Sequence, residues 1–515
     1  MPSSLEVSTA EGLVRGRRIG DLLTWRGVPY ATPPVGPHRL RAPLPVQPWT
    51  GVRDATTFGD AAPQPPKGTA LRPGKHQPTS EDCLTLNVVA PASPSSTPRP
   101  VMVFVHGGSF MMGTTALGIY RGDRLVRRGD VVYVSVNYRL GPLGCLDLTE
   151  FSTAERRFDS NLGLRDQVAA LHWIRRNIAA FGGDPSNVTI FGESAGATSV
   201  TTLMATPAAR NLFARAIAES PAPELVYDAH RATRWARQFV TLLGSDPSDP
   251  SAAARALHTA TPAQLGKAGN RLTAKVLTET PGLHPFGPVV DGEFLPEFPL
   301  DAFASGRAHP VPMIIGTNAR EGTFFPKFMD GLPTSPARIE AMFELTDPQA
   351  RDRVLAAYPG YPDSTSAIDL GGDVTMWKPS IDIAEAHAGH APTYGYRFDF
   401  APRLMHWLDL GATHAFELFA VFGYGESAAG RALTAPGGRR GLRAVTDRVQ
   451  ENWISFAHNG VPAPWWPRYE TELRKTLVFD ASTRIERDPG REKRLAWSGY
   501  HGYRGVPALD SGRRP

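Results

Sequence analysis

Several short apolar runs along the chain are each followed at once by a glycine-rich or polar segment. The clearest are residues 101–105, 188–191 and 312–315. Apolar runs of this length that contain β-branched residues and are bounded by turn residues predict buried strands. The run at 188–191 is followed, after a short turn, by a helix-forming stretch at 197–205. Strands that give way to helices in this manner predict an α/β protein.

The turn between the strand at 188–191 and this helix has the sequence Gly-Glu-Ser-Ala-Gly, centred on Ser194. A sharp strand-to-helix turn places the serine at its tip, and the flanking glycines leave room for the strained backbone. The amide of Ala195 then lies at a helix N-terminus, where it can face a developing oxyanion. The pattern alone is weak evidence, because chance supplies about 0.3 copies in a chain of this length. An ordinary glycine-rich connection is the alternative.

Two other predicted strands end in segments that could take part in the same chemistry. The strand at 101–105 runs into His-Gly-Gly-Ser at 106–109, and consecutive glycines allow backbone amides to face a cavity. The strand at 312–315 is followed by a polar loop that contains Glu321. Catalytic groups of doubly wound sheets lie just beyond the carboxyl ends of the strands, so Glu321 could orient a histidine. A plain tight turn and a solvated loop acid are the respective alternatives.

His414 is the strongest candidate for a catalytic base among the 14 histidines, because an aromatic-rich apolar run follows it in the right place along the chain. The order Ser194, Glu321, His414 is that of α/β-hydrolases and of neither other serine-hydrolase fold. His414 and Glu417 could also be read as two metal ligands. Neither a His-Glu-x-x-His pattern nor a cysteine cluster supports that interpretation, so we expect no metal and no cofactor.

Seven further motifs occur in a fixed order along most of the chain. They are Gly27–Ala31 with Pro33–Gly36, Ser80–Asn87, Asn137–Gly141, Asn161–Gln167, Asn177–Pro185, Gly287–Gly292 and Trp453–Ala457. Together with the segments around Ser194, Glu321 and His414, they resemble the type-B carboxylesterases, the carboxylesterase/cholinesterase family within the α/β-hydrolase fold, in their bacterial form.

The resemblance implies an α/β-hydrolase fold, with a large, mostly parallel central sheet flanked by helices and with helical cap insertions. It implies Ser194 as the nucleophile, His414 as the general base and then acid, and Glu321 as the triad acid. The implied oxyanion donors are the backbone amides of Gly108, Ser109 and Ala195. The polar groups implied to support the triad are Glu193, Ser220 and Glu417.

The chain departs from some relatives in its cysteines and in one loop. Cys83 occupies the position of a disulfide cysteine in secreted relatives but has no upstream partner, and Cys145 is the only other cysteine. We interpret both as buried, reduced thiols, which favours a reducing compartment and a cytoplasmic location. Residues 59–82 contain no aromatic side chain that could hold a quaternary ammonium, so choline-ester specificity is excluded.

Composition limits the remaining function classes. The 515 residues are 41% hydrophobic and 20% charged, and the net charge of +5 comes from scattered residues, so no nucleic-acid partner is expected. No leader segment or long apolar run indicates a membrane. We expect one catalytic domain, with cap-like insertions at about 222–285 and 325–405 and a solvated tail at about 484–515.

These patterns predict a serine carboxylesterase that hydrolyses uncharged, small-molecule esters of short to medium acyl chains. Apolar residues that follow the catalytic segments could line its gorge: Phe110, Met111, Met112, Phe324, Phe325, Phe419 and Phe422. A carbamate or amide hydrolase with the same triad is the alternative. A non-catalytic binding protein is disfavoured, because all three triad residues are present. The sequence does not determine the oligomeric state, for which a monomer or a dimer is expected.

Overall fold

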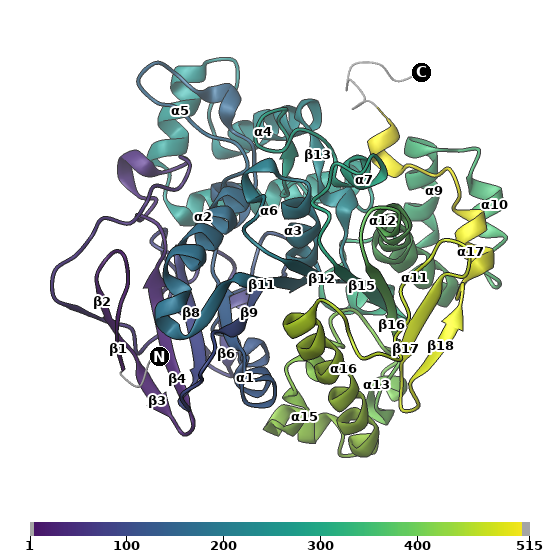
Figure 1. The fold of residues 1–515 in the computed structure, drawn as a ribbon. Helices are drawn as coiled ribbons and strands as arrows, with labels where there is room; N and C mark the ends of the chain where they lie inside the picture. The colour runs from purple at the N-terminus through teal and green to yellow at the C-terminus, as the bar shows by residue number, and fades with distance from the viewer. Residues whose placement is uncertain (1–4, 507–515) are drawn as a thin grey trace.

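The computed structural model describes residues 5–506, and a large central sheet organises this part of the chain (Figure 1). Its strands follow one another in the order β18-β17-β16-β15-β12-β11-β9-β10-β8-β4-β3. The strands from β17 to β10 in this order run parallel, and antiparallel strands complete both edges. The expected large, mostly parallel sheet is confirmed. The bounds are β3 (Arg17–Ile19), β4 (Leu22–Pro29), β8 (Thr85–Pro91), β9 (Arg99–Val105), β10 (Val132–Val136), β11 (Gly183–Glu193), β12 (Arg215–Glu219), β15 (Met313–Asn318), β16 (Thr393–Phe398), β17 (Lys475–Phe479) and β18 (Arg484–Arg487).

Successive residues of the central strands belong to two different hydrophobic cores. Ile190 packs into one core and Phe191 into the other, and Ile315 and Ile314 divide in the same way. Alternate side chains of a strand point to opposite faces, so a strand that is apolar at every position must be covered on both sides. The runs of the sequence are apolar because both faces of these strands are buried.

Helices cover both faces of the sheet (Figure 1). On the upper face in this view lie α2 (Leu162–Asn177), α3 (Ala195–Met204) and α12 (Lys378–Ala388). On the lower face lie α1 (Asp123–Gly129) and α16 (Arg439–Asn459). The helix expected at 197–205 is α3, which begins two residues earlier, directly after Ser194.

The remaining elements are short or lie outside these layers. The helices are α4 (Ala229–Leu243), α5 (Pro250–Thr259), α6 (Pro262–Glu279), α7 (Pro299–Ala304), α8 (Phe325–Phe328), α9 (Pro336–Thr346), α10 (Arg351–Leu355), α11 (Ser364–Gly372), α13 (Arg403–Trp407), α14 (Leu418–Val421), α15 (Ala428–Leu433) and α17 (Arg491–Ala496). The strands are β1 (Glu6–Ser8), β2 (Leu13–Arg15), β5 (Val52–Asp54), β6 (Ala70–Arg72), β7 (Lys75–His76), β13 (Tyr227–Asp228) and β14 (Val289–Val290).

The structure corrects two of the expected boundaries. The insertion expected at 325–405 contains β16, which is a strand of the central sheet, so any insertion there ends before Thr393. The tail expected from residue 484 instead begins with β18, which pairs with β17, and continues into α17. Trp497 and Tyr500 then pack into the core, so apolar burial orders this Arg-rich segment. Residues 507–515 of the expected tail lie outside the described residues.

Cys83 and Cys145 are buried and free, as expected from the absence of a bridging pattern. Burial raises the pKa of both thiols, so they stay protonated and unreactive. None of the helices between residues 5 and 506 combines the length and the hydrophobicity that crossing a bilayer requires.

Candidate active site

Ser194 occupies a strained turn between β11 and α3. Its φ of 59° and ψ of −125° place a residue with a side chain in a region that only glycine adopts readily. Its amide donates to the carbonyl of Glu219 at 2.9 Å, which anchors the turn to the neighbouring strand β12. A Cβ atom on Gly196 would lie 2.1 Å from the carbonyl oxygen of Val105. The glycine of the motif is therefore required because the end of β9 passes directly beneath the turn.

His414 and Glu321 form a buried hydrogen-bonded pair. His414 Nδ1 lies 2.6 Å from Glu321 Oε2, although the two residues are separated by 93 positions in the chain. Glu321 begins the short helical turn η9 (Glu321–Phe324) just beyond β15. Its second oxygen, Oε1, accepts from Ser220 Oγ and from the amide of Asn318, each at 2.6 Å. These donors fix the carboxylate, which in turn accepts from the protonated Nδ1 of the imidazole and so orients the ring.

The Nε2 atom of His414 faces Glu193 in this structure. Glu193 Oε1 lies 3.1 Å from Nε2. Among the described residues, Ser194 Oγ makes no hydrogen bond to this nitrogen. Glu193 and Ser194 are neighbours at the end of β11, so both side chains can reach the imidazole from the same turn.

Four buried carboxyl groups belong to this region: Glu193, Glu321 and Glu417, which act on the charge of His414, and Glu219, which acts on none of its atoms directly but neighbours Glu417 and Glu193. Glu417 Oε1 accepts from Ser220 Oγ at 3.1 Å, and Glu417 Oε2 accepts from Asn318 Nδ2. Glu219 Oε1 accepts from Trp453 Nε1 at 2.7 Å. Ser220 and Asn318 thereby connect Glu321 and Glu417 into one network.

Burial and mutual repulsion govern the charges of this cluster. Burial raises the pKa of Glu417 above its ordinary value, and Glu321 and Glu193 raise it further. Burial likewise raises the pKa of Glu219, and the charge of Glu417 adds to the effect. Both carboxyl groups therefore favour the protonated form more strongly than an exposed glutamate does. For His414, burial opposes the charge, but Glu193 and Glu321 outweigh it and raise the pKa of the imidazole.

The loop after β9 lies against the serine turn. A Cβ atom on Gly107 would lie 2.6 Å from the carbonyl oxygen of Glu193 and 3.1 Å from Ser194 Cβ, so the two segments touch. The backbone turns through positive φ angles of 114° at Gly108 and 55° at Ser109. Within residues 5–506 the amides of these two residues donate no hydrogen bond, and Ala195 opens α3, where the first amides precede the helical ladder. Unpaired amides from both segments thus meet beside Ser194.

Apolar residues surround the imidazole on the side of α8. The rings of Phe325 and Phe324 lie 5.2 and 6.2 Å from that of His414, between ring centroids. Met329 packs on the same small cluster, and its sulfur accepts from Ser109 Oγ at 3.7 Å. The Ser109 hydroxyl is thereby drawn toward Met329.

A cavity of about 850 Å³ adjoins the loop that follows β9. Its walls are mostly apolar and include Pro63, Met111, Leu140, Leu143, Leu265 and Phe286. The amide of Met111 donates to the carbonyl of Gly108 at 3.0 Å, so the cavity borders the turn that presents the free amides. Ser194 itself does not line it.

Some of the residues that the sequence predicts to line the gorge lie near the site, and others lie in the hydrophobic cores. Phe324 and Phe325 lie beside His414, and Met111 lines the cavity. Phe110 and Phe422 are instead buried in the two hydrophobic cores, and Phe419 packs against one of them. Side chains next to a catalytic segment in sequence therefore point into the core as often as into the site.

Two residues of the network were not anticipated from the sequence. Asn318 holds both Glu321 and Glu417, and Glu219 anchors the serine turn through its carbonyl and binds Trp453 through its carboxyl. Both precede a candidate residue closely in the chain, and this proximity is the one signal that could have drawn attention to them. No group of three or more His, Cys, Asp or Glu side chains in the described part of the chain is arranged to hold a metal ion.

The chain is similar in sequence and structure to known proteins. The chain matches the carboxylesterase family over residues 3–497. It is 39% identical to the para-nitrobenzyl esterase of Bacillus subtilis (strain 168) over 492 residues, which cover 95% of this chain and 97% of the relative. It is 34% identical to the liver carboxylesterase of Sus scrofa, covering 90% and 88% of the two chains. The solved structure of a thermophilic PNB esterase superposes with a TM-score of 0.85 at 37% identity, covering 95% of this chain and 99% of that one. The chain therefore belongs to the carboxylesterase family and is a serine esterase with the α/β-hydrolase fold, a carboxylic ester hydrolase.

Proposed function

We propose that Ser194, His414 and Glu321 form the catalytic triad of this esterase. The observation that carries the proposal is the 2.6 Å contact between His414 Nδ1 and Glu321 Oε2 next to a strained serine turn. That contact leaves Nε2 as the basic nitrogen, and the turn holds the serine hydroxyl at the tip of the motif. A small movement of the imidazole from Glu193 toward Ser194 Oγ would complete the triad when substrate binds.

The proposed reaction is acyl transfer in two steps. His414 Nε2 takes the proton of Ser194 Oγ as the oxygen attacks the ester carbonyl. The amides of Gly108, Ser109 and Ala195 hold the resulting oxyanion. His414 then protonates the departing alkoxide, which leaves an acyl-serine ester. Water, deprotonated by the same nitrogen, attacks this ester and releases the carboxylic acid and the free Ser194 hydroxyl.

We propose uncharged esters with short to medium acyl chains as substrates. The largely apolar walls of the cavity beside Met111 favour uncharged groups, and the rings of Phe324 and Phe325 lie beside the imidazole. Helices α4, α5 and α6, within the insertion expected at 222–285, are proposed as part of the cap, since α6 supplies one wall of this cavity. We also propose a cytoplasmic location, supported by the two buried free thiols.

Hydrolysis of p-nitrophenyl esters from acetate to palmitate tests these proposals. Wild type and Ser194→Ala are compared across the series. We expect a maximum at short to medium chains and a loss of roughly 10⁴-fold or more in kcat for the variant. A variant that keeps the wild-type rate would exclude Ser194 as the nucleophile. A maximum at palmitate would contradict the chain-length assignment, and turnover confined to matched carbamates or anilides would contradict the ester assignment.

A further inference from the structure

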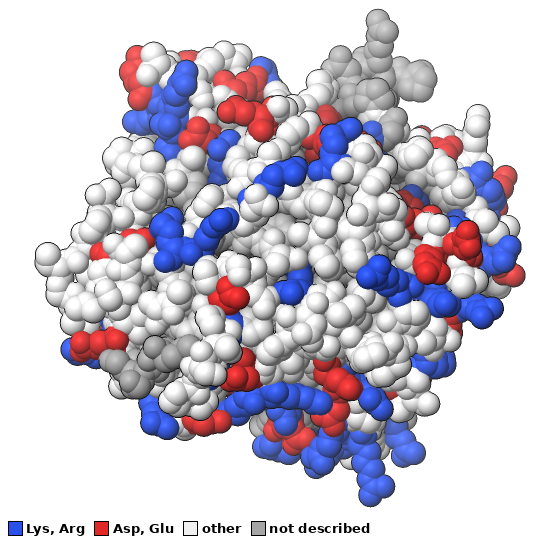
Figure 2. All heavy atoms as spheres, in the orientation of Figure 1, with Lys and Arg blue, Asp and Glu red and all other residues white. Residues whose placement is uncertain are grey.

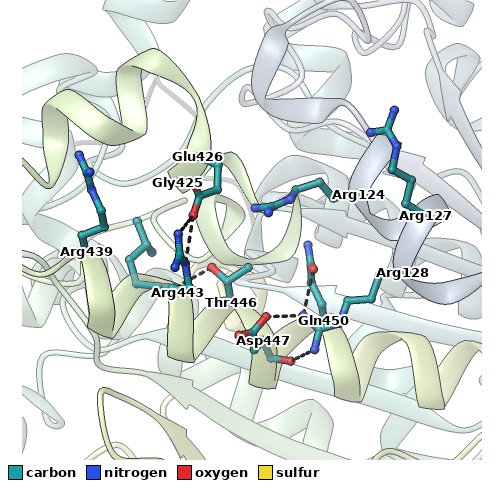
Figure 3. Close-up of a pocket in the computed structure, with 11 residues that line it drawn as sticks. Arg124, Arg127, Arg128, Gly425, Glu426, Arg439, Arg443, Thr446, Asp447 and Gln450 are labelled. Atoms are coloured by element: carbon teal, nitrogen blue, oxygen red, sulfur yellow. Dashed lines mark hydrogen bonds and ion pairs between the residues drawn. The ribbon is translucent and has the colours of Figure 1, made fainter. Parts of the chain in front are cut away.

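A cavity of about 510 Å³ lies far from the triad in sequence, between α1, the short turn η11 (Tyr424–Glu426) and α16 (Figure 3). On the face drawn in Figure 2, Lys and Arg gather with Asp and Glu along the lower edge, where Figure 1 places α1, α15 and α16. Five of the residues that line the cavity are arginines: Arg124, Arg127, Arg128, Arg439 and Arg443. This arginine pocket plays no part in the esterase mechanism above.

The helical repeat explains why these arginines converge. On α1 they occupy positions i, i+3 and i+4, which lie on one face of a helix. On α16 the lining residues begin at Arg439 and continue at the same kind of spacing, ending at Gln450. Two helices that face each other usually share an apolar seam. In the lining of this cavity, by contrast, Leu442 supplies the one apolar side chain, and all the others are polar or charged.

Acidic residues compensate only part of this positive charge. Arg443 Nη2 donates to Glu426 Oε1 at 2.9 Å, and Arg128 Nη1 donates to Asp447 Oδ1 at 2.6 Å. Arg127 pairs with an aspartate outside the pocket, Asp21, through contacts that are exposed to solvent. Glu426 and Asp447 are the only acids in the lining, against five arginines.

Two of the arginines have no carboxylate partner among the described residues. Arg124 Nη1 donates to the carbonyl of Gly423 at 2.9 Å, and the rest of its guanidinium is available. Arg439 makes only long contacts, at 3.5 Å to Thr434 Oγ1 and 3.4 Å to the carbonyl of Arg431. Both side chains therefore retain donors for a ligand.

Glu426 acts as an internal probe of the potential in the pocket. The hydrogen bond from Arg443 lowers the pKa of this exposed carboxyl below its ordinary value against the opposing effect of burial, and the charges of Arg124 and Arg439 lower it further. Arginines of two helices, α1 and α16, thus favour a negative charge at the same place.

We propose that the arginine pocket binds a compact, soluble anion that carries adjacent phosphate groups. Guanidinium groups match phosphate oxygens in bidentate geometry, and a volume of about 510 Å³ is that of a small-molecule site. A single carboxylate satisfies one arginine here, as Glu426 does with Arg443. Linked phosphates supply enough oxygens to engage Arg124 and Arg439 as well.

The pocket also borders the segment that carries the catalytic histidine. Arg124 binds the carbonyl of Gly423, and Gln450 Nε2 binds that of Val421 at 3.0 Å. Both carbonyls lie at the end of α14, which begins one residue after Glu417 and four after His414. An anion that orders Arg124 would hold this segment more firmly, so binding is expected to raise the thermal unfolding temperature.

Calorimetric titration with inorganic pyrophosphate at low ionic strength tests the proposal. We expect saturable binding to wild type that weakens with added salt. The double variant Arg124→Gln/Arg439→Gln is expected to bind at least about tenfold more weakly. The matched control is Arg157→Gln/Arg255→Gln, which removes two exposed arginines elsewhere and the same net charge. The two variants are compared at about 0.1 M salt, where charges more than about 10 Å apart are largely screened, so the control is expected to bind within about twofold of wild type. Retained p-nitrophenyl esterase activity shows that each variant is folded.

A second variant, Glu426→Gln, is expected to strengthen binding, which a misfolded protein would not do. It removes the carboxylate that competes for Arg443, so pyrophosphate is expected to bind about threefold or more tightly. The proposal is overturned if wild type shows no saturable binding, if the control weakens as much as the pocket variant, or if Glu426→Gln fails to tighten binding. Preferential capture by vesicles of anionic lipid would likewise exclude a small soluble ligand.

Discussion

Glu193 Oε1 lies 3.1 Å from His414 Nε2, the nitrogen that receives the serine proton in the proposed mechanism. The other nitrogen of the same imidazole, Nδ1, lies 2.6 Å from Glu321 Oε2. The base is thus placed between two carboxylates, one on each nitrogen. Glu193 immediately precedes Ser194, and the proposed triad requires Nε2 to leave the first side chain for the second.

Substitution Glu193→Gln is expected to move the acid limb of the kcat/KM profile to lower pH by about one unit. His414 acts as a base only when neutral, and Glu193 raises the pKa of the imidazole, so removing this charge lowers that pKa. Activity then persists to a lower pH. The measurement is the pH dependence of p-nitrophenyl butyrate hydrolysis. An unchanged acid limb would mean that Glu193 does not act on the charge of His414.

Substitution Glu321→Gln is expected to lower kcat by roughly 10³–10⁴-fold. The amide cannot stabilise the imidazolium, and it can present its NH₂ group to Nδ1 and so favour the wrong tautomer. The control is Glu344→Gln, which makes the same change of charge at an exposed residue. Rates of the two variants within tenfold of each other would contradict the role of Glu321.

Substitution Gly196→Ala is expected to abolish activity and to lower the free energy of unfolding by several kcal/mol, about 3 or more. The added Cβ atom would lie 2.1 Å from the carbonyl oxygen of Val105, and backbone cannot move away as a side chain can. The control is Gly266→Ala within α6, where a Cβ atom meets nothing within 4 Å. There we expect a gain of about 0.5–1 kcal/mol, because alanine favours the helix. Thermal and denaturant unfolding of both variants compare the two sites, and equal effects would contradict the steric argument.

Substitution Trp453→Phe is expected to destabilise the protein by about 1–3 kcal/mol. It removes the one hydrogen-bond donor that reaches the side chain of the buried Glu219 from within residues 5–506. Trp407→Phe changes a tryptophan that is 70% exposed and is expected to be neutral within about 0.5 kcal/mol. Denaturant midpoints of the two variants provide the comparison. A Trp453→Phe variant as stable as wild type would show that Glu219 needs no hydrogen-bond donor.

Glu417 is expected to make stability depend on pH. Burial and the neighbouring carboxylates raise its pKa in the folded protein above the ordinary value of 4.5, so the folded state holds a proton that the unfolded state releases. Stability therefore falls as pH rises above about 4.5 and keeps falling until the folded-state pKa is reached. Glu417→Gln removes this dependence, so the unfolding temperature of the variant relative to wild type is expected to increase from pH 5 to pH 8. A difference that is constant with pH would contradict the assignment.

The sequence determined those features that follow from neighbouring residues. The runs at 101–105, 188–191 and 312–315 lie in β9, β11 and β15, because strands covered on both faces must be apolar at every position. The glycines around Ser194 were recognisable because a strained turn imposes its requirements locally. The order of candidate residues and the ordered motifs identified the family, which the comparisons confirmed.

Only the tertiary structure decided which side chains from distant parts of the chain come into contact. Glu193 and His414 are separated by more than two hundred residues, as are Glu219 and Trp453, and no local pattern encodes their contact. The same holds for the arginine pocket, whose helices α1 and α16 lie at distant positions in the chain and read separately as solvated surfaces. The segment from residue 484, polar in composition, is ordered because Trp497 and Tyr500 find a core built by other parts of the chain. Such contacts depend on strand order and helix packing, which the sum of many weak, non-local interactions sets.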